Sequence, residues 1–412
     1  MATVVLLGTL DTKGDEYDFL RRKVREEGVD VLLVDTGVLG VPLAEPDISR
    51  QEVAAAAGAS AEDLAGSGDR GAAVEAMARG AAEIVKELHS QGRLDAVLAL
   101  GGSGGTAIAT HAMRELPVGV PKLVVSTMAS GDTRPYVGAV DVTLMYSVVD
   151  IAGLNPISER ILRNAAAAAA GMAKSQGPQA EAKKPLVGAS MFGVTTPSVT
   201  EARKRLEELG YEVLVFHATG TGGQSMEALM RSGFITASLD ITTTELADEL
   251  VGGVLSAGPE RLEAAGELGI PQVVSLGALD MVNFGPFESV PAQFSERLLY
   301  KHNPTVTLMR TTPEECAELG RVIAQKLNRA QGPLTVFVPL KGVSLIATEG
   351  QVFHDPAADE ALFGALREHL DPDVDVRELE LDVNDPEFAN AMADRLHALY
   401  EAWSSERREV RA

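Results

Sequence analysis

Hydrophobic residues along this chain form short apolar runs that alternate with segments of helical spacing. In the first half, apolar runs predict β-strands at residues 3–7, 29–34, 96–100, 122–126 and 140–146. Helical spacing predicts helices at 17–27, 72–89 and 106–116, and a further helix contains the alanine run 165–170. Regular alternation of strand and helix favours an α/β fold with a parallel sheet.

The same alternation restarts after residue 185. Strands are predicted at 186–190, 211–216, 234–240, 272–276, 305–309, 334–339 and 376–381, and helices at 200–209, 225–232, 313–328, 357–369 and 385–403. Residues 174–185 mix Gly, Pro, Gln and charge without periodicity, which is typical of a linker. We therefore expect an α/β protein of two doubly wound Rossmann-like lobes, 1–173 and 186–412, with a cleft between them.

The most informative stretch is a strand, a glycine-rich turn and a helix at residues 94–116. The turn consists of Gly101, Gly102, Ser103, Gly104, Gly105 and Thr106. Amides of such a turn and of the first helical turn lack internal partners, and the helix dipole adds positive charge, so an anion such as phosphate is the usual ligand. The stretch is neither a Walker A loop nor a strict GxGxxG motif, and a tight turn without a ligand is the alternative. A phosphate site requires that the chain's own side chains leave these amides unbonded.

Polar residues also follow the neighbouring strands of the first lobe, at the edge where ligands of parallel sheets bind. With the glycine turn, the nucleotide-binding candidates are Thr9, Asp11, Lys13, Asp35, Ser126, Thr127, Ser130, Gly131 and Asp132. In this interpretation Lys13 or Arg134 neutralises phosphate, and Asp35 accepts hydrogen bonds from ribose hydroxyls. The alternative is that Asp11 and Asp132 only cap helices.

The second lobe offers a candidate catalytic set, in which His217 at a strand end acts as a base and Glu227 or Asp240 orients it. Candidate substrate-binding residues are Thr219, Gly220, Thr221, Gly222, Gly223 and Asp280. A hydroxyl- and glycine-rich turn of this kind can bind a second anion, or it is a turn that needs positive φ. Histidines and carboxylates show no recognised metal-ligand spacing, so any metal stays unknown.

Charge narrows the range of partners. A formal net charge of −23 argues against binding to nucleic acid or to an anionic membrane surface.

The single cysteine, Cys316, cannot form an internal disulfide, which fits a cytoplasmic location. The N-terminal apolar run is short and lacks a basic segment, so we expect a strand rather than a signal peptide.

Read in order, these loops resemble the Tm-1-like ATP-binding family. The motifs that carry the resemblance are GTLDTKGDE, LGGSGGT, VSTMASGD, DIAGLN, MFGVTTPSV, VFHATGTGG, DITTTELADEL, GALDMVNFGP and HNPTVTLMRT. They extend over nearly the whole chain. The resemblance implies two α/β lobes, ATP bound in the first lobe, and a homodimer. The chain departs from the family pattern in having Ser198 where Cys is frequent and Leu276 where Pro is frequent, so a cysteine nucleophile at 198 is absent.

Three functional hypotheses remain open at this point. The first is an ATP-binding protein that acts on or senses a small polar metabolite, with Mg²⁺ held by Asp11 or Asp132 if phosphate is transferred. The second is a hydrolase or C–C lyase of a sugar acid or keto acid that uses His217. The third is a module in which bound ATP controls an interaction with another protein.

Overall fold

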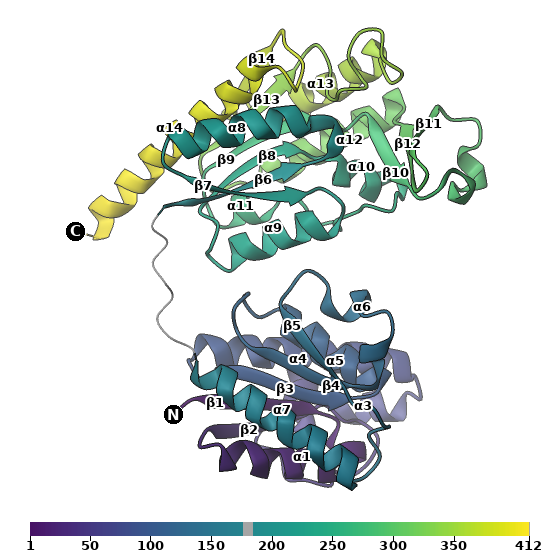
Figure 1. Ribbon diagram of the computed structural model, residues 1–412, viewed down its shortest axis with the longest axis vertical. Coiled ribbons are helices and arrows are strands. Elements are labelled where there is room, and N and C mark those ends of the chain that lie inside the picture. Colours follow the sequence, from purple (N-terminus) through teal and green to yellow (C-terminus); the bar gives the residue numbers. More distant parts are fainter. Residues whose placement is uncertain (176–183, 412) are drawn as a thin grey trace. The chain divides into compact units, whose positions relative to one another are not determined.

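The chain divides into two compact units, Met1–Ala180 and Glu181–Ala412. The computed structural model describes residues 1–175 and 184–411 (Figure 1). Most of the linker predicted at 174–185 lies outside the described residues. Each unit has its own sheet and its own hydrophobic core.

The sheet of the first unit is parallel throughout. Its strands, in spatial order, are β2 (Asp30–Asp35), β1 (Thr3–Gly8), β3 (Ala96–Gly101), β4 (Lys122–Ser126) and β5 (Val142–Tyr146). All residues of β3 are buried, as expected for a run that is apolar on both faces.

Helices cover both faces of this sheet. They are α1 (Leu10–Glu26), α2 (Arg50–Ala56), α3 (Ala61–Gly66), α4 (Arg70–Ser90), α5 (Ser103–Arg114), α6 (Arg134–Val137) and α7 (Pro156–Lys174), with a 3₁₀ turn at Thr127–Ser130. Along β1, Val4 and Leu6 pack with α1 and α7, whereas Val5 and Leu7 pack with α4 and α5 (Figure 1). This alternation makes the unit doubly wound.

The second unit repeats the plan with a longer parallel sheet. Its strands, in spatial order, are β14 (Asp375–Leu379), β13 (Leu334–Pro339), β9 (Gln272–Gly277), β8 (Ala237–Thr242), β6 (Leu186–Met191) and β7 (Glu212–His217). A separate antiparallel sheet contains β10 (Met281–Phe284), β12 (Val306–Arg310) and β11 (Leu299–Asn303). Sequence analysis predicted only the strand at 305–309 of this small sheet.

The larger helices of the second unit also lie on both faces of its main sheet. They are α8 (Thr196–Glu208), α9 (Thr221–Arg231), α10 (Thr244–Val251), α11 (Ala264–Glu267), α12 (Pro313–Leu327), α13 (Pro356–His369) and α14 (Pro386–Arg411), with 3₁₀ turns at Gly193–Thr195, Phe287–Ser289 and Ala292–Phe294. Helices α8 and α14 share one core cluster, and α10, α12 and α13 share another. The predicted α/β fold with two Rossmann-like sheets is confirmed.

Several helices begin earlier than predicted. Helix α1 begins at Leu10 rather than at residue 17, α5 at Ser103 rather than 106, and α9 at Thr221 rather than 225. In each case polar or glycine residues that looked like a loop form the first helical turn. That turn makes few internal hydrogen bonds, so it tolerates such residues. In the described ranges, no helix is long and apolar enough to cross a bilayer.

Candidate functional site

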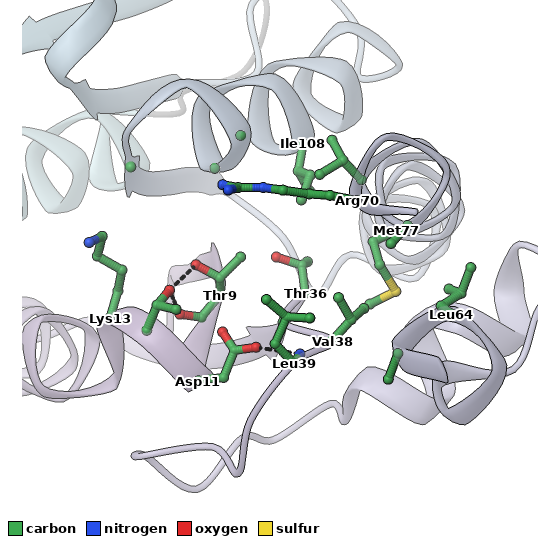
Figure 2. Close-up of a pocket in the computed structure, with 18 of the residues that line it drawn as sticks. Thr9, Asp11, Lys13, Thr36, Val38, Leu39, Leu64, Arg70, Met77 and Ile108 are labelled. Carbon is green, nitrogen blue, oxygen red and sulfur yellow. Dashed lines mark hydrogen bonds between the residues drawn. The ribbon is translucent and has the colours of Figure 1, made fainter. Parts of the chain in front are cut away.

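A cavity of about 390 Å³ lies at the carboxyl ends of β1, β2 and β3 in the first unit (Figure 2). Its lining residues are Thr9, Asp11, Thr12, Lys13, Thr36, Gly37, Val38, Leu39, Leu64, Ala65, Gly68, Asp69, Arg70, Ala73, Val74, Met77, Gly101, Gly102, Ser103, Gly104, Gly105 and Ile108. One part of this set is polar and glycine-rich, and the part from α3 and α4 is mainly apolar.

The topology of the sheet explains why the cavity lies there. Strand β1 leads through α1 to β2 on one side, whereas its neighbour β3 leads through α5 to β4 on the other side. The two connections leave in opposite directions, which opens a crevice beyond the carboxyl ends of β1 and β3.

Tyr17 of α1 secures the base of this crevice. Its buried hydroxyl donates to the carbonyl oxygen of Leu7 at 2.6 Å and accepts the Leu100 amide at 2.9 Å, which links β1 to β3. A Cβ on Gly8 would lie 1.9 Å from the Tyr17 ring, so this position requires glycine. Sequence analysis placed Tyr17 only in a helix, because nothing local shows which strands its hydroxyl reaches.

The glycine turn leaves the start of α5 open. The N-cap is Gly102, and no side chain in the described part of the protein caps the helix. The Thr106 amide is bonded within the turn, to the carbonyl oxygen of Gly102 at 2.9 Å. A Cβ on Gly101 would come within 2.9 Å of the Gly105 Cα, so the turn can close only with glycine there. Amides at this helix start and the dipole of α5 therefore favour an anion in the cavity.

The structure brings together part of the predicted nucleotide-binding set. Thr9, Asp11, Lys13, Gly101, Gly102, Ser103, Gly104 and Gly105 all line the cavity. Its lining does not include Asp35, Thr106, Ser126, Thr127, Ser130, Gly131 and Asp132.

The residues outside the lining have other contacts. Thr106 and Ser126 are buried, and their hydroxyls share a hydrogen bond of 2.7 Å. Asp132 is exposed and forms an ion pair of 2.8 Å with Arg134, which lowers the pKa of its carboxyl group to about 2. Arg134, predicted as a possible phosphate partner, thus pairs with a surface carboxylate.

Two buried carboxylates shape the loop that follows β2. Asp35 accepts the amides of Leu10 at 3.1 Å and Gly37 at 2.8 Å and pairs with Arg50 Nε at 2.8 Å. Asp11 Oδ2 accepts the Leu39 amide at 2.8 Å (Figure 2). Both groups are engaged by the protein itself. Asp35 therefore positions the loop, and its carboxylate is not free in the way that the ribose interpretation requires.

Arg70, at the first position of α4, is a cavity residue that sequence analysis missed. Figure 2 shows its side chain extending across the cavity, and a Cβ on Gly104 would lie 3.8 Å from Arg70 Nη2. Among the described residues no carboxylate forms an ion pair with Arg70. Lys13, the other cation of the lining, donates to the carbonyl oxygen of Ile151. The sequence carries no local sign that the segment around residue 70 folds over the glycine turn.

The glycine-rich turn of the second unit already holds an anion, and it comes from the protein. Glu245 Oε1 accepts the amides of Gly220 at 2.8 Å and Gly223 at 3.1 Å. These two amides are therefore not available to the second external anion that sequence analysis predicted. Thr219 donates its hydroxyl to the His217 carbonyl oxygen, and Thr221 begins α9. Gly222 packs so closely that a Cβ would lie 1.8 Å from the same oxygen.

The two carboxylates of the predicted catalytic set, Glu227 and Asp240, lie around Arg261 together with Glu245. This fully buried guanidinium contacts Asp240 at 2.5 Å, Glu245 at 2.7 Å and Glu227 at 3.4 Å. Burial raises the pKa of the Glu227 carboxyl group. Arg261 was not recognised from the sequence, because an isolated arginine gives no sign of its burial.

His217 stands apart from these carboxylates. It is the exposed last residue of the edge strand β7, and its ring meets Phe192 edge-on at 5.6 Å. In the described part of the protein, no hydrogen bond or ion pair joins His217 to Glu227 or Asp240. Those two residues orient Arg261 rather than the histidine, so the geometry does not support the proposed catalytic set.

Asp280 is buried beyond the end of β9. Its Oδ2 accepts the Ser344 hydroxyl at 2.8 Å, and burial raises the pKa of its carboxyl group to about 6. Its role in substrate binding stays a prediction. Among the described residues, no group of three or more His, Cys, Asp and Glu side chains is arranged to hold a metal ion.

Comparisons with known proteins agree with the resemblance inferred from the motifs. Residues 2–178 and 184–400 match the N-terminal and C-terminal domains of the uncharacterised protein family UPF0261. A UPF0261 protein of Clostridium tetani is 56% identical over 394 residues, covering 95% of this chain and 98% of that protein. The ToMV resistance protein Tm-1 of Solanum lycopersicum is 41% identical over 413 residues, covering 95% of this chain and 55% of that protein.

Solved structures give only a distant likeness. A UDP-N-acetylglucosamine 2-epimerase from Rickettsia bellii aligns over 66% of this chain and 78% of that one, at 13% identity and a TM-score of 0.22. The relatives and the two domain matches, in contrast, extend over nearly the whole sequence. The chain therefore belongs to the UPF0261 family, which includes the tomato Tm-1 protein among its relatives.

Proposed function

We propose that the first unit binds a nucleotide in the cavity at the ends of β1, β2 and β3, and that this nucleotide is ATP. The observation that carries the proposal is a cavity lined by an uncapped, glycine-rich helix start and by two cationic residues, Lys13 and Arg70. A volume of about 390 Å³ lies within the usual range of small-molecule sites.

The polar end suits the phosphates. The helix start supplies amide donors and a positive dipole end, and glycines let an anion approach the backbone. Lys13 and Arg70 add positive charge at the cavity of a chain whose net charge is −23. Such local compensation is needed, because the field of the whole protein repels an anion.

The apolar end suits a base. Leu64, Val74, Met77 and Ile108 line it, and methionine sulfur makes favourable contacts with aromatic rings. Polar phosphate contacts at one end and apolar contacts at the other match the two ends of a nucleotide.

The second unit makes a useful comparison. There the glycine-rich turn that follows the edge strand β7 is filled by Glu245 of the same chain. An internal carboxylate thus accepts amides at one glycine-rich helix start, and among the described residues no side chain accepts the amides at the start of α5. This contrast supports an external anion at the start of α5 in the first unit.

The proposal leaves two possible roles for ATP, which is either hydrolysed or only bound. Asp11 lines the cavity and Asp132 does not, so Asp11 is the better placed of the two Mg²⁺ candidates. Release of phosphate in the presence of ATP and Mg²⁺ would indicate turnover, and binding without release would indicate sensing. The homodimer, the cytoplasmic location and the polar metabolite stay predictions.

Substitution of Gly104 by Val tests the site directly. A Cβ at this position meets nothing closer than Arg70 Nη2 at 3.8 Å, so the variant should fold, while its side chain occupies the space of the anion. We expect ATP affinity to fall more than tenfold by titration calorimetry.

Gly171→Val in α7 is the matched control, because a Cβ on that helical glycine meets no atom within 4 Å. This control should bind ATP like the unaltered protein. Unchanged affinity in a folded Gly104→Val protein would contradict the proposed site, and so would the absence of ATP binding by the unaltered protein.

A further inference from the structure

Thr36, which directly follows β2, has a buried hydroxyl with no partner among the residues that the structure describes. The residue is 1% exposed, and its amide donates to the Gly8 carbonyl oxygen at 2.8 Å, which fixes the backbone beside β1. Within the described residues, the Thr36 Oγ1 makes no hydrogen bond. Figure 2 shows this oxygen pointing into the cavity, toward the space between Thr9 and Arg70.

An unpaired buried hydroxyl is unfavourable, and most buried polar groups in native proteins have a partner. Nearby polar groups do not fill this role. The Thr9 hydroxyl pairs with that of Thr12 at 3.0 Å, and Asp11 holds the loop amides. None of the described residues supplies a partner, and Thr36 lines the cavity, so we infer that a molecule in the cavity supplies it.

The position of Thr36 indicates which part of a nucleotide supplies it. In dinucleotide-binding folds, an acidic residue at the end of the second strand binds the ribose. Here that residue, Asp35, is occupied by two backbone amides and Arg50. Thr36 is the next residue and faces the cavity. A threonine hydroxyl donates and accepts, as a sugar hydroxyl does, so the two groups are complementary.

We propose that the Thr36 hydroxyl binds a ribose hydroxyl of the nucleotide and makes the site select ribonucleotides over deoxyribonucleotides. This inference rests on the proposed function. It assigns sugar recognition to a residue that touches no phosphate, so it predicts a change in selectivity rather than a general loss of binding.

The test is calorimetric titration with ATP, 2′-deoxy-ATP and 3′-deoxy-ATP. The unaltered protein should bind ATP about tenfold more tightly than the analogue that lacks the contacted hydroxyl, and the comparison of the two analogues identifies that hydroxyl. Thr36→Val replaces the hydroxyl with a methyl group. This variant should bind ATP only as weakly as the unaltered protein binds that analogue, and its affinity for the analogue should equal that of the unaltered protein. Thr36→Ser keeps the hydroxyl and should keep the preference.

Thermal unfolding without nucleotide gives a second readout. Removing an unpaired hydroxyl should leave the unfolding temperature of Thr36→Val unchanged or raised. The control Thr195→Val removes a buried hydroxyl that pairs with Thr242 at 2.7 Å, and it should lower the unfolding temperature. A lowered temperature for Thr36→Val would show that the hydroxyl already has a partner and would overturn the proposal.

The binding outcomes separate the two claims. Equal affinity of the unaltered protein for all three nucleotides overturns the role of Thr36 and leaves the nucleotide site intact. If Thr36→Val weakens the binding of all three nucleotides by the same factor, the role of Thr36 in sugar recognition is likewise overturned and the nucleotide site is not. Failure of the unaltered protein to bind any of them overturns the proposed function, and the role of Thr36 with it.

Discussion

Single carboxylates decide which of the two glycine-rich turns is open. Glu245 fills the amides of Gly220 and Gly223 and also contacts Arg261 at 2.7 Å. In the first unit, Asp35 and Asp11 instead point to the loop after β2. The two glycine-rich turns therefore differ in whether a neighbouring carboxylate contacts their amides.

The internal anion of the second unit should be important for stability. Glu245→Gln removes a buried charge from Arg261 and should lower the free energy of unfolding by about 3 kcal/mol, since one partner of a buried ion pair is lost. Chemical denaturation followed by Trp403 fluorescence measures this loss, because the single tryptophan lies in the second unit.

Glu207→Gln is the control for this substitution. Glu207 forms an exposed pair with Arg203 within α8, and such pairs contribute little, so a change below about 1 kcal/mol is expected. Equal effects of the two substitutions would contradict the role given to Glu245.

At the scale of elements, a buried contact joins α10 to β10. Asp248 accepts the Leu255 amide at 3.2 Å and both the amide and the side chain of Asn283, at 3.1 and 2.6 Å. Burial raises the pKa of its carboxyl group from 3.8 to about 7. Asn283 Oδ1 is buried and makes no hydrogen bond within the described residues.

These contacts predict a pH-dependent effect of Asp248→Asn. Between pH 4 and pH 7 the carboxyl group ionises in the unfolded chain but stays protonated in the folded one, so folding loses stability as the pH rises. The neutral amide escapes this loss and can donate to Asn283 Oδ1 if that side chain turns over. The stability of the variant relative to the unaltered protein should therefore increase from pH 4 to pH 7, by at most about 4 kcal/mol.

Denaturation at a series of pH values measures this difference. A constant difference across pH 4–7 would show that Asp248 ionises in the folded protein as it does in the unfolded chain. Asp394→Asn is a useful comparison for the stability measurement, since Asp394 forms a half-exposed pair with Arg205 whose loss should lower the free energy of unfolding by less than about 1 kcal/mol.

Helix starts show at the same scale what sequence patterns can predict. Helices α12 and α13 were predicted to within one residue, because Thr312 and Asp355 cap them and a proline follows each cap. Helices α5 and α9 begin after Gly102 and Gly220, N-cap residues that have no side chain to mark the start, and both predictions began too late. A cap is a local signal, whereas an uncapped start depends on what approaches the amides.

At the scale of the whole molecule, the two units have separate sheets and cores. If ATP binds in the first unit, it should stabilise that unit by mass action. Circular dichroism reports on both units, whereas Trp403 fluorescence reports on the second. Saturating ATP should therefore raise the unfolding temperature of the circular dichroism transition that has no fluorescence counterpart more than that of the fluorescence transition. Gly104→Val should remove this ATP effect. An equal rise of both transitions would contradict separate stabilisation.

The sequence by itself determined the class of fold, the division into two repeated α/β units and the glycine turn at residues 101–106, because hydrophobic period, strand composition and glycine position are local properties. It also determined the family, through motifs spread along the chain. Tertiary structure alone decided which carboxylates hold loops, how deeply Arg261 is buried and which buried hydroxyls lack a partner among the described residues. These properties depend on contacts between residues far apart in the chain, such as Gly220 with Glu245 and Arg70 with the glycine turn, and no local pattern encodes them.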